Sequence, residues 1–526
     1  MVRACLHSTA VVLISAVVGR AGDLSVVSVE PAAHTMTALR DTPITVHFDR
    51  PVIRSSITPP GRFWAFGRWS GTVTGSFAFD DSDRTVRLLA DHPLSAGESV
   101  TVYLSDDIEG TDGTNLRPAG FSFQFGIRPR AGRLDFAEID RRTTRTTPSV
   151  GSRAYGGIAS DLNRDRWLDL TIVNEDTADL RVFLNRGDGT GLFHAFLQPT
   201  FPVGPRASPS EPSDFNRDGN VDICVANINA NTVSILLGNG DGTYQPQQAV
   251  TVGVAPRGIA VLDAEGDGDV DIVNTNSTSS NMSILFNDGT GVFSGPSFFE
   301  GGGINEWALG SADMNDDGIL DLVIGAIGSD RVIVALGNGN GTFTNAFSRD
   351  CGGDVWMIAL GDVNGDGTDD VAVANGGSDN GAILLNEGDG LLSAAQVYPT
   401  DPFTLATDLG DLDGDGDLDW VTSSFFGDWI LFENDGAGAF TENQRFPATA
   451  SSSCSLAMDF DNDGDLDLAL IDETADEVIL MQQQGPFIPA LSTVGAVAFG
   501  LLLLAAGAVI ARRSARGTDV RRWEER

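Results

Sequence analysis

Short apolar runs recur along the central part of the chain, and turn-forming residues separate them. In one repeat the runs are 258–262, 272–273 and 282–286, and a fourth run begins with Phe293. A Gly- and Asn-containing turn at 287–291 precedes that fourth run. Short apolar runs between turn residues predict β-strands. Four such strands in a repeat of about 40–50 residues predict the blade of a β-propeller.

A nine-residue polar string, of the general form D-x-[D/N]-x-D-G-x-x-D, lies between the first and second strands of each repeat. We call the strings aspartate loops one to seven. They begin at Asp161, Asp214, Asp263, Asp313, Asp362, Asp411 and Asp459. The first aspartates of successive loops are 53, 49, 50, 49, 49 and 48 residues apart. This regular spacing predicts a propeller of seven blades.

The seventh repeat ends early, because no fourth strand follows residues 478–481. An unpaired strand edge at this point would favour aggregation. Residues 133–139, ahead of the first repeat, have the pattern of the missing strand. We therefore predict that 133–139 pairs into the seventh blade and closes the ring.

The spacing of oxygen donors in the aspartate loops predicts calcium binding. Side chains at positions 1, 3 and 5 point into one loop, and Gly at position 6 permits the sharp bend. Hard oxygen ligands without His or Cys favour Ca²⁺ over zinc or copper. An EF-hand needs Glu at position 12, but Ile172, Val225 and Asn274 stand at that position in the first three repeats. Asp, Asn and Gly also form hydrogen-bonded turns, but turns alone do not require up to five carboxylates in nine residues.

The expected calcium ligands occupy positions 1, 3, 5, 7 and 9 of each loop, with the backbone carbonyl as the donor at position 7. They are Asp161, Asn163, Asp165, Trp167, Asp169, Asp214, Asn216, Asp218, Asn220, Asp222, Asp263, Glu265, Asp267, Asp269, Asp271, Asp313, Asn315, Asp317, Ile319, Asp321, Asp362, Asn364, Asp366, Thr368, Asp370, Asp411, Asp413, Asp415, Asp417, Asp419, Asp459, Asp461, Asp463, Asp465 and Asp467. Up to seven Ca²⁺ are expected. Loop one is the weakest candidate, since Arg166 replaces the glycine and Arg164 lies beside it.

These loops resemble the FG-GAP/VCBS repeats of integrin-α-type β-propellers, over residues 133–485. The resemblance implies a propeller that holds Ca²⁺ at positions 1, 3, 5, 7 and 9 of each loop. It does not name a ligand, because members of the family bind many different molecules or accompany enzymes.

Residues 23–128 contain no aspartate loop and alternate between apolar and polar positions. The segments 44–48, 85–89, 99–104 and 121–125 alternate with period two. Such strands predict a β-sandwich. The segment 41–52 resembles the SbsA-type bacterial Ig-like domain. Trp64 and Trp69 in this domain either cap the sandwich core or form an aromatic platform for a sugar.

Both ends of the chain predict export and membrane anchoring. Residues 1–22 combine an early Arg, an apolar stretch and small residues, as a secretory signal peptide does. Residues 486–511 carry no charge and predict a transmembrane helix. The Arg-rich tail at 512–526 predicts a cytoplasmic end. Residues 488–492 resemble the IPTL-CTERM sorting signals, which implies processing of the tail during surface sorting.

Composition excludes some functions. With 73 acidic and 33 basic residues, the chain has a net charge of −40, so nucleic-acid binding is excluded. The five His do not cluster, and no nucleophile motif is present, so no catalytic residues are expected.

The predicted fold is all-β: a seven-bladed propeller with calcium loops, an N-terminal Ig-like β-sandwich and one C-terminal transmembrane helix. The expected function is that of an exported, surface-anchored binding or adhesion module for an extracellular glycan or protein. The alternatives are a passive structural protein of the cell envelope and a carbohydrate-active enzyme that uses the propeller face.

Overall fold

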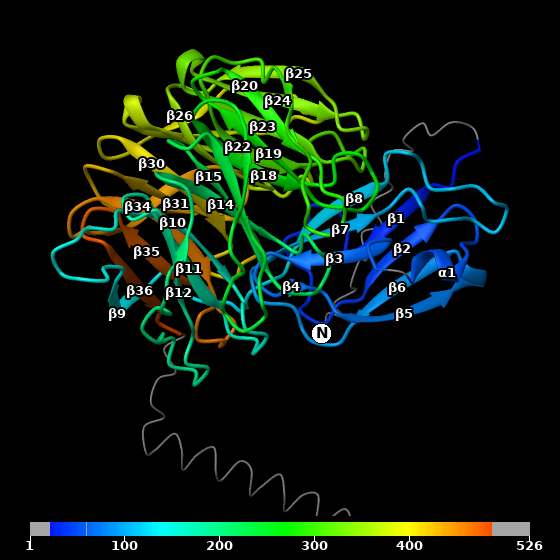
Figure 1. Ribbon diagram of the computed structural model, residues 1–526, viewed down its shortest axis with the longest axis horizontal. Helices are drawn as coiled ribbons and strands as arrows, with labels where there is room; N and C mark the ends of the chain where they lie inside the picture. The colour runs from blue at the N-terminus through cyan, green and yellow to red at the C-terminus, as the bar shows by residue number, and fades with distance from the viewer. Residues whose placement is uncertain (1–21, 59, 486–526) are drawn as a thin grey trace, which may run out of the picture. The chain divides into compact units, whose positions relative to one another are not determined.

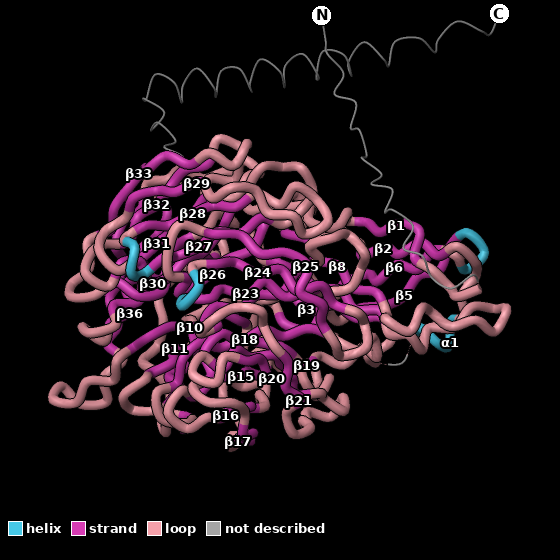
Figure 2. Tube along the Cα trace, turned by 90° about the horizontal axis from the view of Figure 1, so that it is seen from above, coloured by secondary structure: helices cyan, strands magenta, loops and turns pink. Residues whose placement is uncertain are grey.

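The computed structural model describes residues 22–58 and 60–485. Within these residues the chain folds into nine β-sheets of four strands each. Figure 2 shows that strands and loops account for nearly all of the described chain, apart from short helical turns. These turns are α1 (Arg54–Ile57), η1 (Asp81–Asp83), η2 (Ile327–Ser329) and η3 (Gly376–Ser378).

Two of the nine sheets form the N-terminal β-sandwich. The first sheet has the strand order β1 (Val26–Glu30), β2 (Ile44–Phe48), β6 (Thr85–Ala90) and β5 (Gly75–Asp80). The second has the order β4 (Gly71–Thr72), β3 (Phe63–Gly67), β7 (Ser99–Leu104) and β8 (Phe121–Gly126). Alternate side chains of both sheets, such as Val46, Val86, Val102 and Phe123, are buried in one core. The apolar side chains at every second position of these strands therefore form the core between the two sheets of the sandwich.

The other seven sheets are the propeller blades. Blade one contains β10 (Ala154–Ser160), β11 (Asp169–Asn174), β12 (Asp179–Phe183) and β13 (Phe201–Pro202); blade two contains β14 (Ala207–Ser213), β15 (Asp222–Asn227), β16 (Thr232–Leu236) and β17 (Gln248–Thr251). Blade three contains β18 (Pro256–Leu262), β19 (Asp271–Asn276), β20 (Asn281–Leu285) and β21 (Ser297–Phe299); blade four contains β22 (Glu306–Ala312), β23 (Asp321–Ala326), β24 (Arg331–Gly337) and β25 (Phe343–Asp350). Blade five contains β26 (Val355–Gly361), β27 (Asp370–Asn375), β28 (Asn380–Leu384) and β29 (Gln396–Pro399); blade six contains β30 (Thr404–Gly410), β31 (Asp419–Ser424), β32 (Trp429–Asn434) and β33 (Phe440–Phe446). Blade seven contains β34 (Ser452–Met458), β35 (Asp467–Asp472), β36 (Glu477–Gln483) and β9 (Phe136–Thr143).

The blades form a closed ring. The first strand of each blade contacts the first strand of the next, from β10 to β34, and β34 contacts β10 again (Figure 1). The last blade takes its fourth strand from the chain ahead of the first blade, since β9 pairs antiparallel with β36. This strand overlaps the predicted closing segment 133–139 but begins at Phe136. The ring therefore has no open sheet edge at the join.

The second strand of each blade lies deepest in the propeller. In β11, β15, β19, β23, β27, β31 and β35 all six residues are buried. Each of these strands begins with the Asp at position 9 of an aspartate loop. Neighbouring blades cover both faces of the strand, so the apolar run is continuous rather than alternating. Each loop is thereby fixed to the most buried strand of its blade.

The structure does not support the prediction of a membrane-spanning helix. The described residues contain no helix that is both long enough and apolar enough to cross a membrane. A span needs about 20 residues, whereas α1, the one α-helix among the described residues, has four. The predicted span at 486–511 and the tail at 512–526 lie outside the described residues, as does the predicted signal peptide except for Gly22. The structure therefore supports an all-β fold class without a transmembrane helix. The prediction that a single-pass helix anchors the protein in a membrane is not supported either.

Candidate metal loops and the domain that docks on them

In loops one to five, hydrogen bonds to the aspartates at positions 1 and 9 shape the loop, and loop four shows the arrangement. Asp313, at position 1, accepts the backbone N–H of Asp317 at 3.0 Å and that of Gly318 at 2.7 Å. Asp321, at position 9, accepts the N–H of Met314 at 2.9 Å and that of Gly337 at 2.7 Å. The first pair of bonds closes the loop, and the second ties it to the third strand of the same blade.

Two loops bring three carboxylates together. In loop six the oxygens of Asp411, Asp413 and Asp415 lie within 4.8 Å of one another. The aspartates at the same positions of loop seven, Asp459, Asp461 and Asp463, do so as well. Loops one, two, four and five have Asn at position 3, so an amide oxygen takes the place of one carboxylate. Loop three has carboxylates at positions 1, 3 and 5, but within the described residues they do not form such a group.

Several carboxylate oxygens in these loops are buried without a hydrogen bond. By distance and angle, neither oxygen of Asp411 and only one oxygen of Asp467 accepts a hydrogen bond among the described residues, although the nearby backbone N–H groups of Gly416 and Gly414 offset part of the rise in the pKa of Asp411. A buried, unpaired carboxylate oxygen is costly. A hard cation coordinated by these oxygens would remove that cost, and the donor set of carboxylate, amide and carbonyl oxygens fits Ca²⁺.

Burial also changes the protonation of the position 9 aspartates. Burial, together with the nearby Asp413 and Asp417, raises the pKa of Asp419 to about 8. Burial likewise raises the pKa of Asp467 to about 9, with Asp461 and Asp459 contributing. Without a cation, burial favours the protonated form of these groups, and a bound divalent ion would favour their ionised form.

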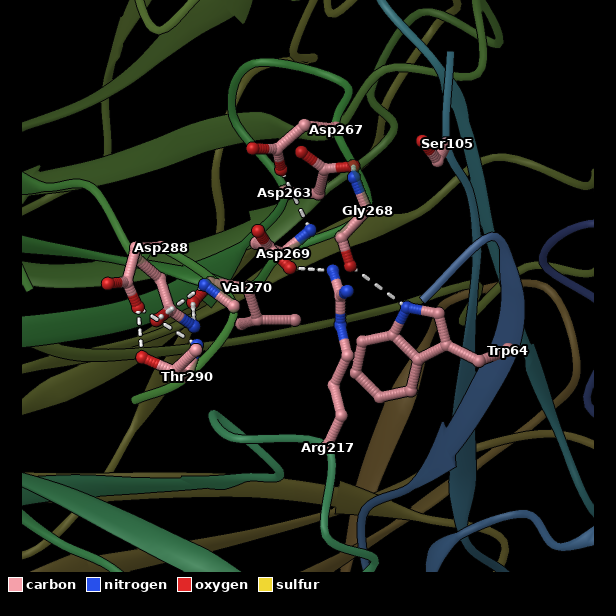
Figure 3. Close-up of polar contacts among 12 residues, drawn as sticks. Trp64, Ser105, Arg217, Asp263, Asp267, Gly268, Asp269, Val270, Asp288 and Thr290 are labelled. Atoms are coloured by element: carbon pink, nitrogen blue, oxygen red, sulfur yellow. Dashed lines mark hydrogen bonds and ion pairs between the residues drawn. The ribbon is translucent and has the colours of Figure 1, made fainter. Parts of the chain in front are cut away.

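Arginines occupy positions in loop one and form ion pairs with aspartates of loops three and seven. In loop one, Arg164 and Arg166 both have left-handed backbone conformations, with φ of 62° and 70°. In loop three, Arg217 of the preceding blade forms an ion pair with Asp269 (Figure 3). In loop seven, Arg130 contacts Asp463 at 2.8 Å and Asp465 at 2.6 Å. The loops are therefore not equivalent in charge.

The Ig-like domain docks directly on the aspartate loops, a contact that the sequence did not predict. The indole Nε1 of Trp64 donates to the carbonyl of Gly268 at 3.0 Å (Figure 3). The N–H of Asp106 donates to the carbonyl of Gly266 at 2.8 Å. Both glycines belong to loop three, at positions 6 and 4. Their carbonyls, which the tight turn directs outward, therefore serve as acceptors for the neighbouring domain.

Three other loops are contacted through a glycine in the same way. The Nη2 of Arg117 donates to the carbonyl of Gly318 in loop four at 2.8 Å. The Nη2 of Arg128 donates to Gly414 in loop six at 3.1 Å. The N–H of Arg130 donates to Gly464 in loop seven at 2.6 Å.

A buried histidine of the Ig-like domain also binds the loop face. His34 is 3% exposed, and its ring nitrogens lie 3.1 Å from Asp316 and 3.1 Å from Asp369. Burial lowers the pKa of His34, but Asp369 and Asp316 outweigh burial and raise it to about 11. The histidine is therefore a cation that joins the Ig-like domain to loops four and five.

Trp64 and Trp69 of the Ig-like domain neither cap the sandwich core nor form an exposed platform for a sugar, the two roles predicted from the sequence. Trp64 is 7% exposed and packs in a cluster that is composed mainly of propeller residues, not in the sandwich core. Trp69 packs against residues of blades one and seven, and its carbonyl accepts the N–H of Asp161 in loop one at 2.7 Å. Both side chains secure the interface between the domains.

A cavity of about 420 Å³ lies inside the ring. First strands of the blades supply its walls, and Phe66, Tyr103 and Phe125 of the Ig-like domain line it at the loop end. Arg68 from the same domain forms an ion pair with Glu211 of β14. Side chains of the Ig-like domain thus close the central channel at the end where the aspartate loops lie.

Together these features define a seven-bladed, propeller-type repeat protein whose acidic loops face a second β domain. The family described as FG-GAP-like repeat matches residues 214–274, 313–373, 362–422 and 411–470, which include loops two to seven. The family described as bacterial Ig-like domain matches residues 21–126. The chain therefore carries FG-GAP-like repeats and an N-terminal bacterial Ig-like domain, in agreement with the resemblance seen in the sequence.

Solved structures with similar folds have low sequence identity. A lectin of Agrocybe aegerita that recognises non-reducing terminal N-acetylglucosamine is 19% identical, with 57% of this chain and 81% of that chain covered and a TM-score of 0.40. BBS1N, solved in complex with ARL6DN, is 11% identical, with 68% and 99% covered and a TM-score of 0.47. A putative 6-phosphogluconolactonase of Bacteroides fragilis is 13% identical, with 73% and 95% covered and a TM-score of 0.44. No curated protein sequence matches the chain.

Proposed function

We propose that this protein is a calcium-dependent binding module that recognises a glycan or a protein. The observation that carries the calcium part is the group of buried carboxylate oxygens of Asp411 and Asp467, which have no hydrogen-bond partner among the described residues. Up to seven ions would occupy the loops, and the strongest candidates are loops six and seven, where three carboxylates converge.

The role of calcium in this proposal is to hold the loops in the shape on which the Ig-like domain docks. Gly266, Gly268, Gly318 and Gly414 each accept a hydrogen bond from that domain, and Gly464 accepts one from Arg130 in the segment that follows it. Each of these glycines belongs to a loop whose acidic side chains would surround an ion. Without the ion, repulsion among the carboxylates would favour other loop conformations. Calcium would therefore stabilise the loops and the domain interface together.

The positions of the clustered carboxylates favour a binding function for this protein over a catalytic one. FG-GAP-like repeats and Ig-like domains are typical of non-catalytic modules. The two groups of three convergent carboxylates found among the described residues belong to loops six and seven, where an ion would occupy them. The face of the ring away from the Ig-like domain is left to contact a ligand.

The test of this proposal is the calcium content of the purified full-length chain after dialysis in millimolar calcium, together with its thermal unfolding before and after chelation. We expect about five to seven ions per chain and a large fall in the melting temperature on chelation. The double variant Asp411→Asn, Asp413→Asn should lose about one ion. Near-zero calcium with an unchanged melting temperature would refute the proposal.

A further inference from the structure

The end of the central channel opposite the aspartate loops has a distinct set of side chains. The first strand of each blade ends at an aspartate loop, so its beginning lies at the other end of the channel. The second residues of β18, β22 and β26 are Arg257, Trp307 and Trp356, and each of these strands has a register shift at that point. We call these three residues, with Tyr155 and Phe403, the channel mouth.

Aromatic rings form a continuous arc along this mouth. The ring centroids of Trp307 and Trp356 are 4.6 Å apart, and those of Trp356 and Phe403 are 4.8 Å apart. Phe426, which is 69% exposed, extends the arc from Phe403 at 6.3 Å. Trp307, Trp356 and Phe403 are only partly buried. Such rings can stack on a flat apolar face of a ligand.

Arg257 is the buried cation at one end of the arc. Its guanidinium lies 3.7 Å from the centre of the Trp307 ring, and the residue is 9% exposed. No hydrogen bond or ion pair of its side chain is found among the described residues, and its Nε is buried and unpaired. Burial lowers its pKa to about 10, so it is charged at neutral pH.

The charged groups near Arg257 already have partners. Arg153 contacts Glu473 at 2.5 Å and Glu175 at 3.3 Å, and Arg206 lies 3.7 Å from Glu175. Asp176, beside Glu175, is exposed to solvent. The carboxylates of the mouth thus form their ion pairs with two other arginines. Glu175 attracts Arg257 at longer range, but no ion pair to Arg257 is found among the described residues. A buried guanidinium without an acceptor is unfavourable until a ligand supplies one.

We propose that the channel mouth binds a carboxylated sugar, such as the uronic acid residue of a glycan. This inference rests on the proposed binding function and names its ligand class. The carboxylate pairs with Arg257, and the sugar ring stacks on the arc of Trp307, Trp356 and Phe403. The buried Nε1 of Trp356, which has no hydrogen-bond partner among the described residues, is a donor for a sugar hydroxyl. On a chain of net charge −40, an anionic ligand is repelled elsewhere, and the unpaired Arg257 selects for it here.

The experiment is calorimetric titration of the calcium-loaded full-length chain with methyl glucuronide and, as the matched neutral sugar, methyl glucoside. We expect saturable binding of the glucuronide and binding of the glucoside that is about tenfold weaker or more. The variant Arg257→Gln should lose the preference for the acidic sugar, and Trp356→Leu should weaken binding of both sugars. Arg331→Gln is the control, because Arg331 is exposed on β24 and its side chain bonds, among the residues that the structure describes, only Ser348.

Equal affinity for the two sugars, or an unchanged glucuronide affinity in a folded Arg257→Gln protein, would overturn the inference, and so would the absence of glucuronide binding. These failures differ from failure of the proposed function, since calcium content and thermal unfolding are measured on the same samples without sugar. A chain that holds calcium but binds no acidic sugar refutes only the inference.

Discussion

The indole of Trp64 in the Ig-like domain donates a hydrogen bond to the carbonyl of Gly268 in aspartate loop three, 204 residues further along the chain. Gly268 has a φ of 87°, which permits the sharp bend at position 6 of the loop. One residue therefore shapes the candidate metal loop and anchors the neighbouring domain. Anything that changes the loop is expected to change the docking of the Ig-like domain.

The Trp64→Phe variant tests this bond. Phenylalanine keeps an aromatic ring in the interface but removes the N–H, which leaves the buried carbonyl of Gly268 without its donor. We expect the free energy of unfolding to fall by about 1–3 kcal/mol, as measured by urea denaturation in calcium. The matched control is Trp69→Phe, because no hydrogen bond of the Trp69 indole is found among the described residues. Equal losses in the two variants would show that ring packing, and not the bond, stabilises the interface.

Removal of calcium should expose the segment that joins the two domains. Arg130 lies in this segment, where its side chain contacts Asp463 and Asp465 and its N–H donates to Gly464. If loop seven rearranges without calcium, trypsin should cleave after Arg130 at least several times faster in chelator. Mass spectrometry of the early fragments measures this rate.

The control for the proteolysis is Arg84, an exposed residue of the Ig-like domain that lies in the turn before β6. Its cleavage rate should not depend on calcium. If cleavage after Arg130 is as slow in chelator as in calcium, the docking of the Ig-like domain does not depend on the ion.

A glycine at position 6 of loop one should stabilise the propeller. Arg166 has a φ of 70°, where a side chain is strained, whereas loop two has Gly219 at the same position with a φ of 81°. We expect Arg166→Gly to raise the free energy of unfolding by about 1 kcal/mol and to strengthen calcium binding at loop one. The reverse exchange, Gly219→Arg, should destabilise loop two, since a side chain is strained at a φ of 81°. Urea denaturation and calcium content measure both effects, and a destabilised Arg166→Gly protein would contradict the argument.

Local periodicity explains why much of the fold could be predicted. Each aspartate loop is followed at once by a buried strand, so the seven regularly spaced strings set the order of the blades. The pattern of period two likewise identified β2, β6, β7 and β8 of the sandwich. These features depend on neighbours within about ten residues, which the sequence displays directly.

The domain interface could not be predicted, because it depends on contacts between distant residues. Nothing near Trp64 in the sequence indicates Gly268 as its partner, and Arg130 belongs to a stretch that has the composition of an ordinary linker. The position of three carboxylates within 4.8 Å in loops six and seven, but not in loop three, depends on the geometry of the folded loops. The charge-free stretch 486–511 and the Arg-rich tail after it suggested a transmembrane helix, and this segment lies outside the described residues.

Acid should weaken the closure of the ring through Asp476, in the turn between β35 and β36. This carboxylate accepts the Nε of Arg145 at 2.7 Å and the N–H of Ser152 at 2.9 Å, so it joins the chain after β9 to the start of blade one. Burial raises the pKa of Asp476, but the donors from Arg145, Ser152 and Arg153 outweigh burial and lower it. A carboxyl with a lowered pKa stabilises the fold above its unfolded-state pKa, near 3.8, and this stabilisation is lost as the pH falls through the folded-state pKa.

The variant Asp476→Asn should therefore be less stable than the parent chain at pH 7, by about 1–3 kcal/mol, and the difference should shrink as the pH falls below about 4. Urea denaturation at pH 7, 5, 4 and 3 measures the difference. Arg145→Gln removes the partner, so the double variant should lose less stability than the sum of the two single variants. A stability difference that is independent of pH, with additive single variants, would show that Asp476 acts through packing and not through its charge.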